Sequence, residues 1–222
     1  MKLTDLWTQA GQALAGTPWP EYPRPSLRRD SFFNLNGEWE FSVGEPRFDR
    51  RIRVPFPPES LLSGVHEVFP EDAPLFYRRR FTLPAGFVKS RVILHFGAVD
   101  QTAEVWLNGV RLGAHVGGYA PFSFDITDAL QDKNELRVRV EDHLSRHVLP
   151  YGKQKRERGG MWYTPVSGIW QTVWLESVPE DYVRAVRFET HKNRVKARID
   201  GINNGILRVE NFAVEVQNGR AA

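Results

Sequence analysis

Residues 151–168 contain the residue types best suited to chemistry in this sequence. The stretch reads YGKQKRERGGMWYTPVSG and combines basic and amide side chains with adjacent aromatic rings. An aromatic face can stack on a pyranose, while amide and ammonium groups hydrogen-bond the hydroxyl groups of a sugar. The candidate carbohydrate-binding residues are Lys153, Gln154, Trp162 and Tyr163. The alternative is that these side chains only pack the domain, because aromatic residues belong to a core more often than to a site.

A second loop, residues 66–74, carries three carboxylates. Glu67, Glu71 and Asp72 could face a ligand. Acidic residues beside proline are also common in solvated connections between elements. That pattern favours an ordinary surface loop.

The histidines do not form a recognisable metal motif. His143 and His147 lie near Glu141 and Asp142, but they lack the His-Glu-x-x-His order of a zinc site. The sequence has no cysteine, no Gly-x-Ser-x-Gly elbow and no phosphate-binding glycine loop. We therefore predict no catalytic residue, no metal site and no cofactor in this chain.

Charge and hydropathy exclude several classes of partner. The 222 residues carry 30 Lys and Arg against 27 Asp and Glu, so the net charge is only +3 and the two signs are interleaved. Nucleic-acid binding would need a basic stripe facing one way, so we predict no nucleic-acid partner. No apolar run approaches the roughly 18 residues of a membrane span. Asp5 interrupts the region where a signal peptide needs an apolar stretch. We therefore expect no membrane association and a cytoplasmic protein.

The elements that must position the candidate residues are mainly strands. Residues 1–16 have near-helical apolar spacing, but the period then changes to two, which is typical of strands with one face in the core. Asn108-Gly109 predicts a hairpin with a type I′ turn. Many short strands with turns between them predict an all-β jelly-roll sandwich. The alternating segments are 39–43, 92–96, 103–107, 122–126 and 136–140.

A change of unit is expected near Pro179, after a predicted strand over 169–176. Three further strands are predicted in 186–188, 195–199 and 212–216, with a turn or bulge near Glu210-Asn211. An immunoglobulin-like sandwich needs about seven strands, so this unit is incomplete and its apolar face lacks a partner sheet. A later segment, the first domain or another protomer could cover that face. The predicted organisation is a lead-in (1–25), a jelly-roll domain (26–179) and a partial immunoglobulin-like domain (180–222).

Several sequence blocks resemble the opening of family 2 glycoside hydrolases. The resemblance covers roughly residues 26 to 178, and its blocks keep their order. They include NLNGEWEF (34–41), VPFPPES (54–60), YRRRF (77–81), AEVWLNG (103–109), GGYAPF (117–122) and GMWYTPVSGIWQTVWLE (160–176).

This resemblance implies a galactose-binding-like jelly roll, then an immunoglobulin-like domain, then a (β/α)8 barrel with two catalytic glutamates. Such a barrel alone takes about 250 residues, so these 222 residues cannot include one. The chain alone is expected to be inactive, because in this family both catalytic carboxyls belong to the barrel. The implied function is a sugar-binding and scaffold domain of an enzyme that hydrolyses terminal β-O-glycosidic bonds, with a β-glycoside ligand and its own barrel as partners.

The resemblance also leaves alternatives open. In family members the loop before the Ser-Gly-Ile-Trp-like segment can supply an Asp that hydrogen-bonds the sugar, but Gly160, Met161 and Trp162 stand near that position here. That contact cannot be transferred to this chain. One alternative is a free-standing carbohydrate-binding module without catalysis. Another is a structural sandwich that forms a homo-oligomer.

Overall fold

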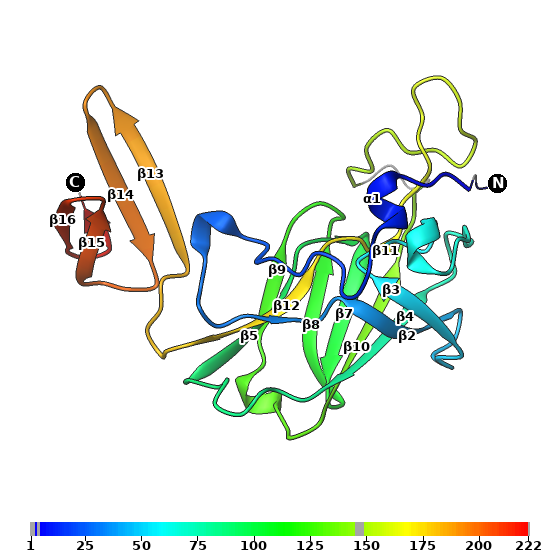
Figure 1. Ribbon diagram of the computed structural model, residues 1–222, viewed down its shortest axis with the longest axis horizontal. Coiled ribbons are helices and arrows are strands. Elements are labelled where there is room, and N and C mark those ends of the chain that lie inside the picture. Colours follow the sequence, from blue (N-terminus) through cyan, green and yellow to red (C-terminus); the bar gives the residue numbers. More distant parts are fainter. Residues whose placement is uncertain (1–2, 4, 145–148, 222) are drawn as a thin grey trace.

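The computed structural model describes residues 3, 5–144 and 149–221, and β-strands dominate it (Figure 1). The all-β class predicted from the alternating pattern is therefore confirmed. The predicted N-terminal helix is only one turn long, α1 (Gln9–Gln12), and Thr8 caps it. Single 3-10 turns occur at η1 (Pro25–Leu27), η2 (Leu61–Ser63) and η3 (Thr127–Ala129). Within the described ranges, no helix has the length and apolar character needed to cross a membrane.

Two antiparallel sheets form the first sandwich. The larger has the order β3-β2-β4-β10-β7-β8, and the smaller has the order β1-β12-β5-β9. The larger sheet consists of β2 (Gly37–Val43), β3 (Arg50–Val54), β4 (Leu75–Phe81), β7 (Thr102–Leu107), β8 (Val110–Val116) and β10 (Asn134–Glu141). The smaller consists of β1 (Phe33–Asn34), β5 (Arg91–Phe96), β9 (Phe122–Asp125) and β12 (Val173–Val178).

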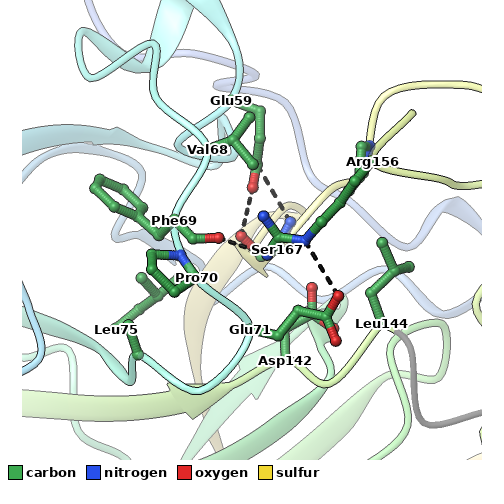
Figure 2. A pocket seen from close by; sticks show the side chains of 12 residues that line it. Glu59, Val68, Phe69, Pro70, Glu71, Leu75, Asp142, Leu144, Arg156 and Ser167 are labelled. Carbon is green, nitrogen blue, oxygen red and sulfur yellow. Dashed lines mark hydrogen bonds and ion pairs between the residues drawn. The ribbon is translucent and has the colours of Figure 1, made fainter. Parts of the chain in front are cut away.

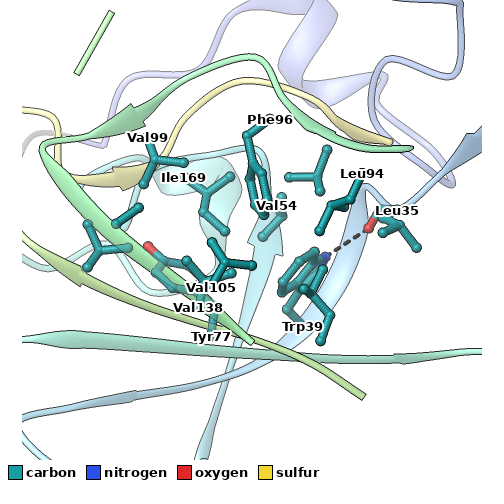
Figure 3. Close-up of a cluster of buried hydrophobic side chains, with 14 of the residues drawn as sticks. Leu35, Trp39, Val54, Tyr77, Leu94, Phe96, Val99, Val105, Val138 and Ile169 are labelled. Carbon is teal, nitrogen blue, oxygen red and sulfur yellow. Dashed lines mark hydrogen bonds between the residues drawn. The ribbon is translucent and has the colours of Figure 1, made fainter. Parts of the chain in front are cut away.

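The core lies between these sheets (Figure 3). Trp39 and Tyr77 from the larger sheet and Phe96 from the smaller are fully buried. The indole Nε1 of Trp39 donates a 2.8 Å hydrogen bond to the carbonyl oxygen of Leu35, so its polar atom is satisfied inside the core. Residues of β7 and β10 alternate between core and surface, as their period of two predicts.

The hairpin between β7 and β8 turns at Asn108-Gly109, as predicted. Both residues have positive φ, 51° and 83°, which a type I′ turn requires. The Asn108 side chain also donates to the carbonyl oxygen of Ala129 at 2.7 Å and to Oδ1 of Asn134 at 2.9 Å. The turn is thus fixed both by its own backbone and by the neighbouring loop.

The prediction of one strand over 169–176 is wrong. The segment forms β11 (Gly168–Ile169), which pairs with β6 (Val99–Asp100), and then β12, which pairs with β1 and β5. Both ladders are interrupted at the same level, where Gly97 lies so close to Gln171 that a Cβ at position 97 would be 2.7 Å from the Gln171 Cβ. The backbone hydrogen bond from Gly97 N to Thr172 O, 2.9 Å long, bridges the interruption.

A buried ionic cluster covers the second face of β12. The carboxylate of Glu176 lies 2.7 Å from Nη2 of Arg24, 2.8 Å from Nε of Arg29 and 3.2 Å from Nε2 of His95. The imidazole of His95 stacks on Trp174 with ring centroids 4.8 Å apart. The lead-in therefore closes over the sheet, which explains why Trp174 is buried although its position alternates with the core residues.

The C-terminal strands form two small sheets apart from the first sandwich (Figure 1). The prediction of three strands here is wrong, because there are five: β13 (Ala185–His191), β14 (Arg194–Asp200), β15 (Gly205–Val209), β16 (Phe212–Val216) and β17 (Arg220–Ala221). Glu210, at φ 49°, forms the turn predicted between the last long strands. The exposed fractions of Phe188 and Phe212 are 60% and 74%, so the apolar faces are only partly covered. The domain boundaries proposed above stay a prediction.

Candidate functional site

Two loops meet at one end of the first sandwich. The loop 151–168 is the later part of the connection from β10 to β11 and ends at the first residue of β11, and the loop 64–74 leads from η2 to β4. Arg156 joins them: its Nη2 donates a 2.6 Å hydrogen bond to the carbonyl oxygen of Phe69, and its Nε lies 3.1 Å from Oε1 of Glu71 (Figure 2). The loop 151–168 is therefore held in one place by a guanidinium that bridges a carbonyl group and a carboxylate.

The loop 151–168 folds back on itself. The backbone N–H of Tyr163 donates to the carbonyl oxygen of Lys153 at 2.8 Å, and that of Lys155 donates back to Tyr163 at 3.1 Å. Gly160, at φ 57°, permits the reversal between the two arms, because glycine adopts this conformation without a steric penalty. Three of the four predicted sugar-binding residues, Lys153, Gln154 and Tyr163, thus become neighbours.

Gln154 organises the inside of the loop. Its Nε2 donates to the hydroxyl of Tyr119 at 2.8 Å and to the carbonyl oxygen of Tyr151 at 2.6 Å. Its Oε1 accepts a 2.5 Å hydrogen bond from the backbone N–H of Val166. Much of the hydrogen-bonding capacity of this amide is therefore used within the protein.

A groove of about 460 Å³ lies between the two loops. Of the four predicted residues, Gln154 and Trp162 line it, while Lys153 and Tyr163 do not. The Lys155 ammonium lies 5.9 Å from the centroid of the Trp162 ring, in cation–π geometry. The remaining lining residues, which the sequence analysis did not single out as sugar contacts, are Glu71, Leu144, Tyr151, Lys155, Arg156 and Glu157. The groove thus presents an aromatic ring beside charged groups, and the four proposed sugar contacts stay a prediction.

Three acidic side chains lie beneath the loop. Glu59 and Asp100 are buried, and Asp142 is partly buried. Burial raises the pKa of Glu59 to about 7, that of Asp100 to about 7 and that of Asp142 to about 6. The negative charge of Asp142 further raises the pKa values of Glu59 and Asp100. At neutral pH Glu59 and Asp100 therefore keep part of the protonation that ordinary carboxyls would have lost.

Each of these acids meets a residue of the loop 151–168. The Ser167 hydroxyl donates a hydrogen bond to Glu59, the side chain of Gln154 acts on Asp100, and the charge of Arg156 acts on Asp142. All three contacts lower the pKa of their acid and oppose the effect of burial. The sequence gives no local pattern for this arrangement, because residues 59, 100 and 142 come from three separate segments.

The space around Glu59 and Asp142 is small. A cavity of about 20 Å³ is bordered by Glu59, Asp142, Arg156 and Ser167, among others (Figure 2). That volume is roughly what a single water molecule needs. The groove above can accept a larger molecule, whereas this inner cavity cannot.

The other predicted clusters have structural partners or lie apart from the groove. Glu67 pairs with Arg50, and Asp72 is exposed. His147 lies outside the described residues, and Nε2 of His143 lies 3.8 Å from Oε2 of Glu141. Across residues 3, 5–144 and 149–221, no three His, Asp or Glu side chains are arranged to hold a metal ion.

The fold defines the class of the first domain: it is a β-sandwich of the galactose-binding-like type. A model described as "Glycosyl hydrolase 2 galactose-binding domain-like" matches residues 67–177, which is half of the chain. The chain therefore belongs to this family of glycosyl hydrolase 2 domains. The family assignment made from the sequence blocks is confirmed.

Individual relatives agree with this assignment. A β-galactosidase of Thermoanaerobacter pseudethanolicus is 28% identical over 165 residues, covering 72% of this chain and 21% of the relative. A β-glucuronidase of Felis catus is 26% identical over 236 residues, covering 88% of this chain and 35% of the relative. The solved β-glucuronidase of Faecalibacterium prausnitzii superposes with a TM-score of 0.63 at 24% identity, covering 90% of this chain and 41% of that one. The chain thus spans between about a fifth and two fifths of the length of these proteins.

Proposed function

We propose that this chain is the sugar-binding and scaffold part of an enzyme that hydrolyses terminal β-glycosidic bonds. The observation that carries the proposal is the groove between the loops 64–74 and 151–168, where the Trp162 ring lies beside the Lys155 ammonium and the Gln154 amide. An aromatic ring flanked by polar groups is suited to binding one face of a pyranose and its hydroxyl groups. The relatives named β-galactosidase and β-glucuronidase support the same function.

The catalytic acids of such an enzyme would come from outside this chain. Retaining hydrolysis needs two carboxyls about 5 Å apart on either side of the scissile bond. Glu59 and Asp142 do border one cavity, but its volume of about 20 Å³ cannot admit a sugar ring. We infer that these acids support the loop and that a barrel supplies both catalytic groups.

Hydrolysis of a panel of chromogenic β-glycosides tests the proposal. We expect no turnover by the 222-residue chain and turnover by a longer product of the same reading frame that includes a barrel. In that longer protein, Trp162→Ala should raise KM, because it removes the ring that borders the groove. Met161→Ala is the matched control, since Met161 is an exposed apolar residue of the same loop that does not line the groove. Turnover by the short chain, or equal effects of the two variants, would contradict the proposal.

A carbohydrate-binding module without catalysis is the second candidate. The specific observation in its favour is that an aromatic ring, an amide and charged side chains of this chain come together in one groove. This function predicts saturable binding of a β-glycoside by the 222-residue chain, with binding lost in Trp162→Ala. Titration calorimetry that detects no heat over a panel of neutral and acidic sugars would remove it.

Two further expectations stay predictions. One is the cytoplasmic location. The other is the homo-oligomer, for which the exposed Phe188 and Phe212 provide apolar surface. Light scattering over a concentration series measures the oligomeric state directly, and a monomer at every concentration would argue against self-association.

A further inference from the structure

A second, larger groove lies between the lead-in and the edge of the six-stranded sheet. Its volume is about 680 Å³, within the usual range for small-molecule sites of about 300–1,000 Å³. The walls come from α1 and the segment after it, from η2, and from β2, β3 and β4. We call it the arginine groove, after Arg51, Arg53 and Arg79, which line it.

The helix α1 closes one side of the arginine groove. Gly11 lies against Leu62 of η2, since a Cβ at position 11 would be 3.4 Å from Leu62 Cδ1. Thr8 holds the turn by accepting a 3.0 Å hydrogen bond from the Gly11 N–H. The groove therefore has a fixed wall on the lead-in side, opposite the sheet edge.

Positive charge exceeds negative charge in the arginine groove. Glu38 is the single acid among its lining residues, and its Oε1 lies 3.7 Å from Nη1 of Arg51, with both side chains more than half exposed. Arg53 is the cross-strand neighbour of Glu38 on the same sheet face, and it forms no ion pair with any acid in the part of the chain that the structure describes. Arg51 and Arg53 thus share the outer face of the sheet with Glu38, while Arg79 belongs to the alternating set of β4 that carries Tyr77 and Phe81.

Arg79 adds an incompletely satisfied guanidinium. It donates from Nη1 to the carbonyl oxygen of Glu38, but its Nε is buried and has no hydrogen-bond partner among the described residues. Burial lowers the pKa of Arg79, although a guanidinium remains charged at neutral pH. An anion bound in the groove would supply the counter-charge that the protein itself does not.

Several other lining residues are suited to binding a ligand with a polar ring. Trp7 is 50% exposed, so half of its indole is available to stack on a ligand. Gln12 and Thr17 are exposed along the same groove and offer amide and hydroxyl groups. Guanidinium groups bind planar carboxylates with matched hydrogen bonds, while an indole favours the flat face of a pyranose.

We propose that the arginine groove binds an acidic saccharide, with its carboxylate at Arg51 and Arg53 and a ring face on Trp7. This binding does not depend on the hydrolysis proposed above, because the groove is formed by residues of this chain other than those lining the loop 151–168 groove. An experiment can therefore contradict one of the two proposals without contradicting the other.

Titration calorimetry of the 222-residue chain with trigalacturonic acid tests this site. The matched ligand is the fully methyl-esterified trisaccharide, which keeps the rings and hydroxyl groups but has no carboxylate. We expect a Kd of about 1 mM or tighter for the acid and at least about fivefold weaker binding for the ester. Equal affinity for both ligands, or no heat with the acid, would overturn the proposal.

Three variants locate the binding. Arg53→Gln and Trp7→Ala alter exposed side chains, so folding should be preserved, and each should weaken binding of the acid by about fivefold. Arg187→Gln is the matched control, because Arg187 is an exposed arginine of β13 outside the groove and its loss changes the net charge equally. If Arg187→Gln weakens binding as much as Arg53→Gln does, the chain attracts anions through its net charge alone and the site does not exist.

Arg79→Gln is a further variant. Its affinity for the acid is interpreted together with its thermal unfolding curve. Arg79 is half-buried, so a loss of binding caused by unfolding would appear as a lowered Tm. A folded Arg79→Gln protein with unchanged affinity would contradict a contribution of the Arg79 charge to binding. Arg53→Gln and Trp7→Ala decide the proposal whichever way Arg79→Gln behaves.

Discussion

The hydroxyl of Ser167 donates a 2.6 Å hydrogen bond to Oε1 of the buried Glu59, and its backbone N–H lies 3.3 Å from Oε2. Ser167 therefore provides a hydrogen-bond donor to each oxygen of a carboxyl that is buried away from water. The contact joins the end of the loop 151–168 to the segment between β3 and η2. The loop is consequently anchored near its C-terminal end by Ser167 and near its N-terminal end by Arg156.

Removing the Ser167 hydroxyl should destabilise the first domain. Ser167→Ala leaves the buried Glu59 with one donor fewer, and we expect the free energy of unfolding to fall by about 1–3 kcal/mol. Urea denaturation followed by tryptophan fluorescence measures it. Ser26→Ala, at an exposed position of η1, is the control and should match the unaltered protein. A Ser167→Ala protein as stable as this control would mean that the hydrogen bond contributes nothing.

Stability should fall as the pH rises from about 4 to about 7. Glu59, Asp100 and Asp142 have raised pKa values in the folded protein, of about 7, 7 and 6, against ordinary values of about 4. The folded state therefore binds more protons than the unfolded state in this window. The three carboxyls stabilise the fold fully below about pH 4, and this stabilisation is lost as the pH rises to about 7. Glu176 acts in the opposite sense, because its pKa is lowered and its contribution is lost in acid.

Urea unfolding between pH 4.5 and 8 measures this slope, and Glu59→Gln identifies part of its origin. The amide does not titrate, so the variant should lose less stability between pH 5 and 8 than the unaltered protein. Glu67→Gln is the control, since Glu67 is exposed and paired at the surface. An identical slope in Glu59→Gln and in the unaltered protein would show that Glu59 is not one of the titrating groups.

The ionic cluster at Glu176 should contribute strongly to stability. Glu176→Gln leaves Arg24 and Arg29 without their carboxylate, and breaking such a buried network costs about 3 kcal/mol or more. Glu45→Gln breaks an ion pair with Arg47 that is exposed on both sides and should have no measurable effect. Equal melting temperatures for the two variants would contradict the importance of the buried cluster.

Arg156 should control how often the loop 151–168 opens. Arg156→Ala removes the contacts with Phe69 and Glu71, and we expect cleavage by chymotrypsin near Trp162 and Tyr163 to become about tenfold faster. Lys153→Ala is the control, because Lys153 is exposed and its backbone pairing is kept. Unchanged cleavage in Arg156→Ala would mean that the loop is held by Ser167 and Gln154 alone.

Local pattern was enough to predict several strands of the first sandwich, but it missed β3 and the interruptions between strands. The period of two located β2, β7 and β10, and Asn108-Gly109 located the hairpin, because these features depend on neighbouring residues. The break before β12 depends on the approach of Gly97 to Gln171, 74 residues away, and has no local sign. The strand β15 was missed because Ile206 and Leu207 are adjacent and do not alternate.

The candidate site was predicted in part for the same reason. The composition of residues 151–168 indicated a sugar-binding loop, and Gln154 and Trp162 do line its groove. The side on which Lys153 and Tyr163 lie depends on the backbone pairing between the two arms of the loop, which composition does not encode. The burial of Glu59 and Asp100 depends on tertiary contacts of segments far apart in the sequence.

The closure of the lead-in over Glu176 also constrains how the chain acquires its structure during synthesis. Arg24 and Arg29 leave the ribosome about 150 residues before their carboxylate partner, so they cannot form these ion pairs while most of the sandwich is being made. Contacts of such long separation slow folding, because the intervening chain must be ordered first. Arg29 also donates to the carbonyl oxygen of Val183 and lies 5.3 Å from the Tyr182 ring centroid. Completion of the first domain and ordering of the connection to β13 are thus expected to be one late event.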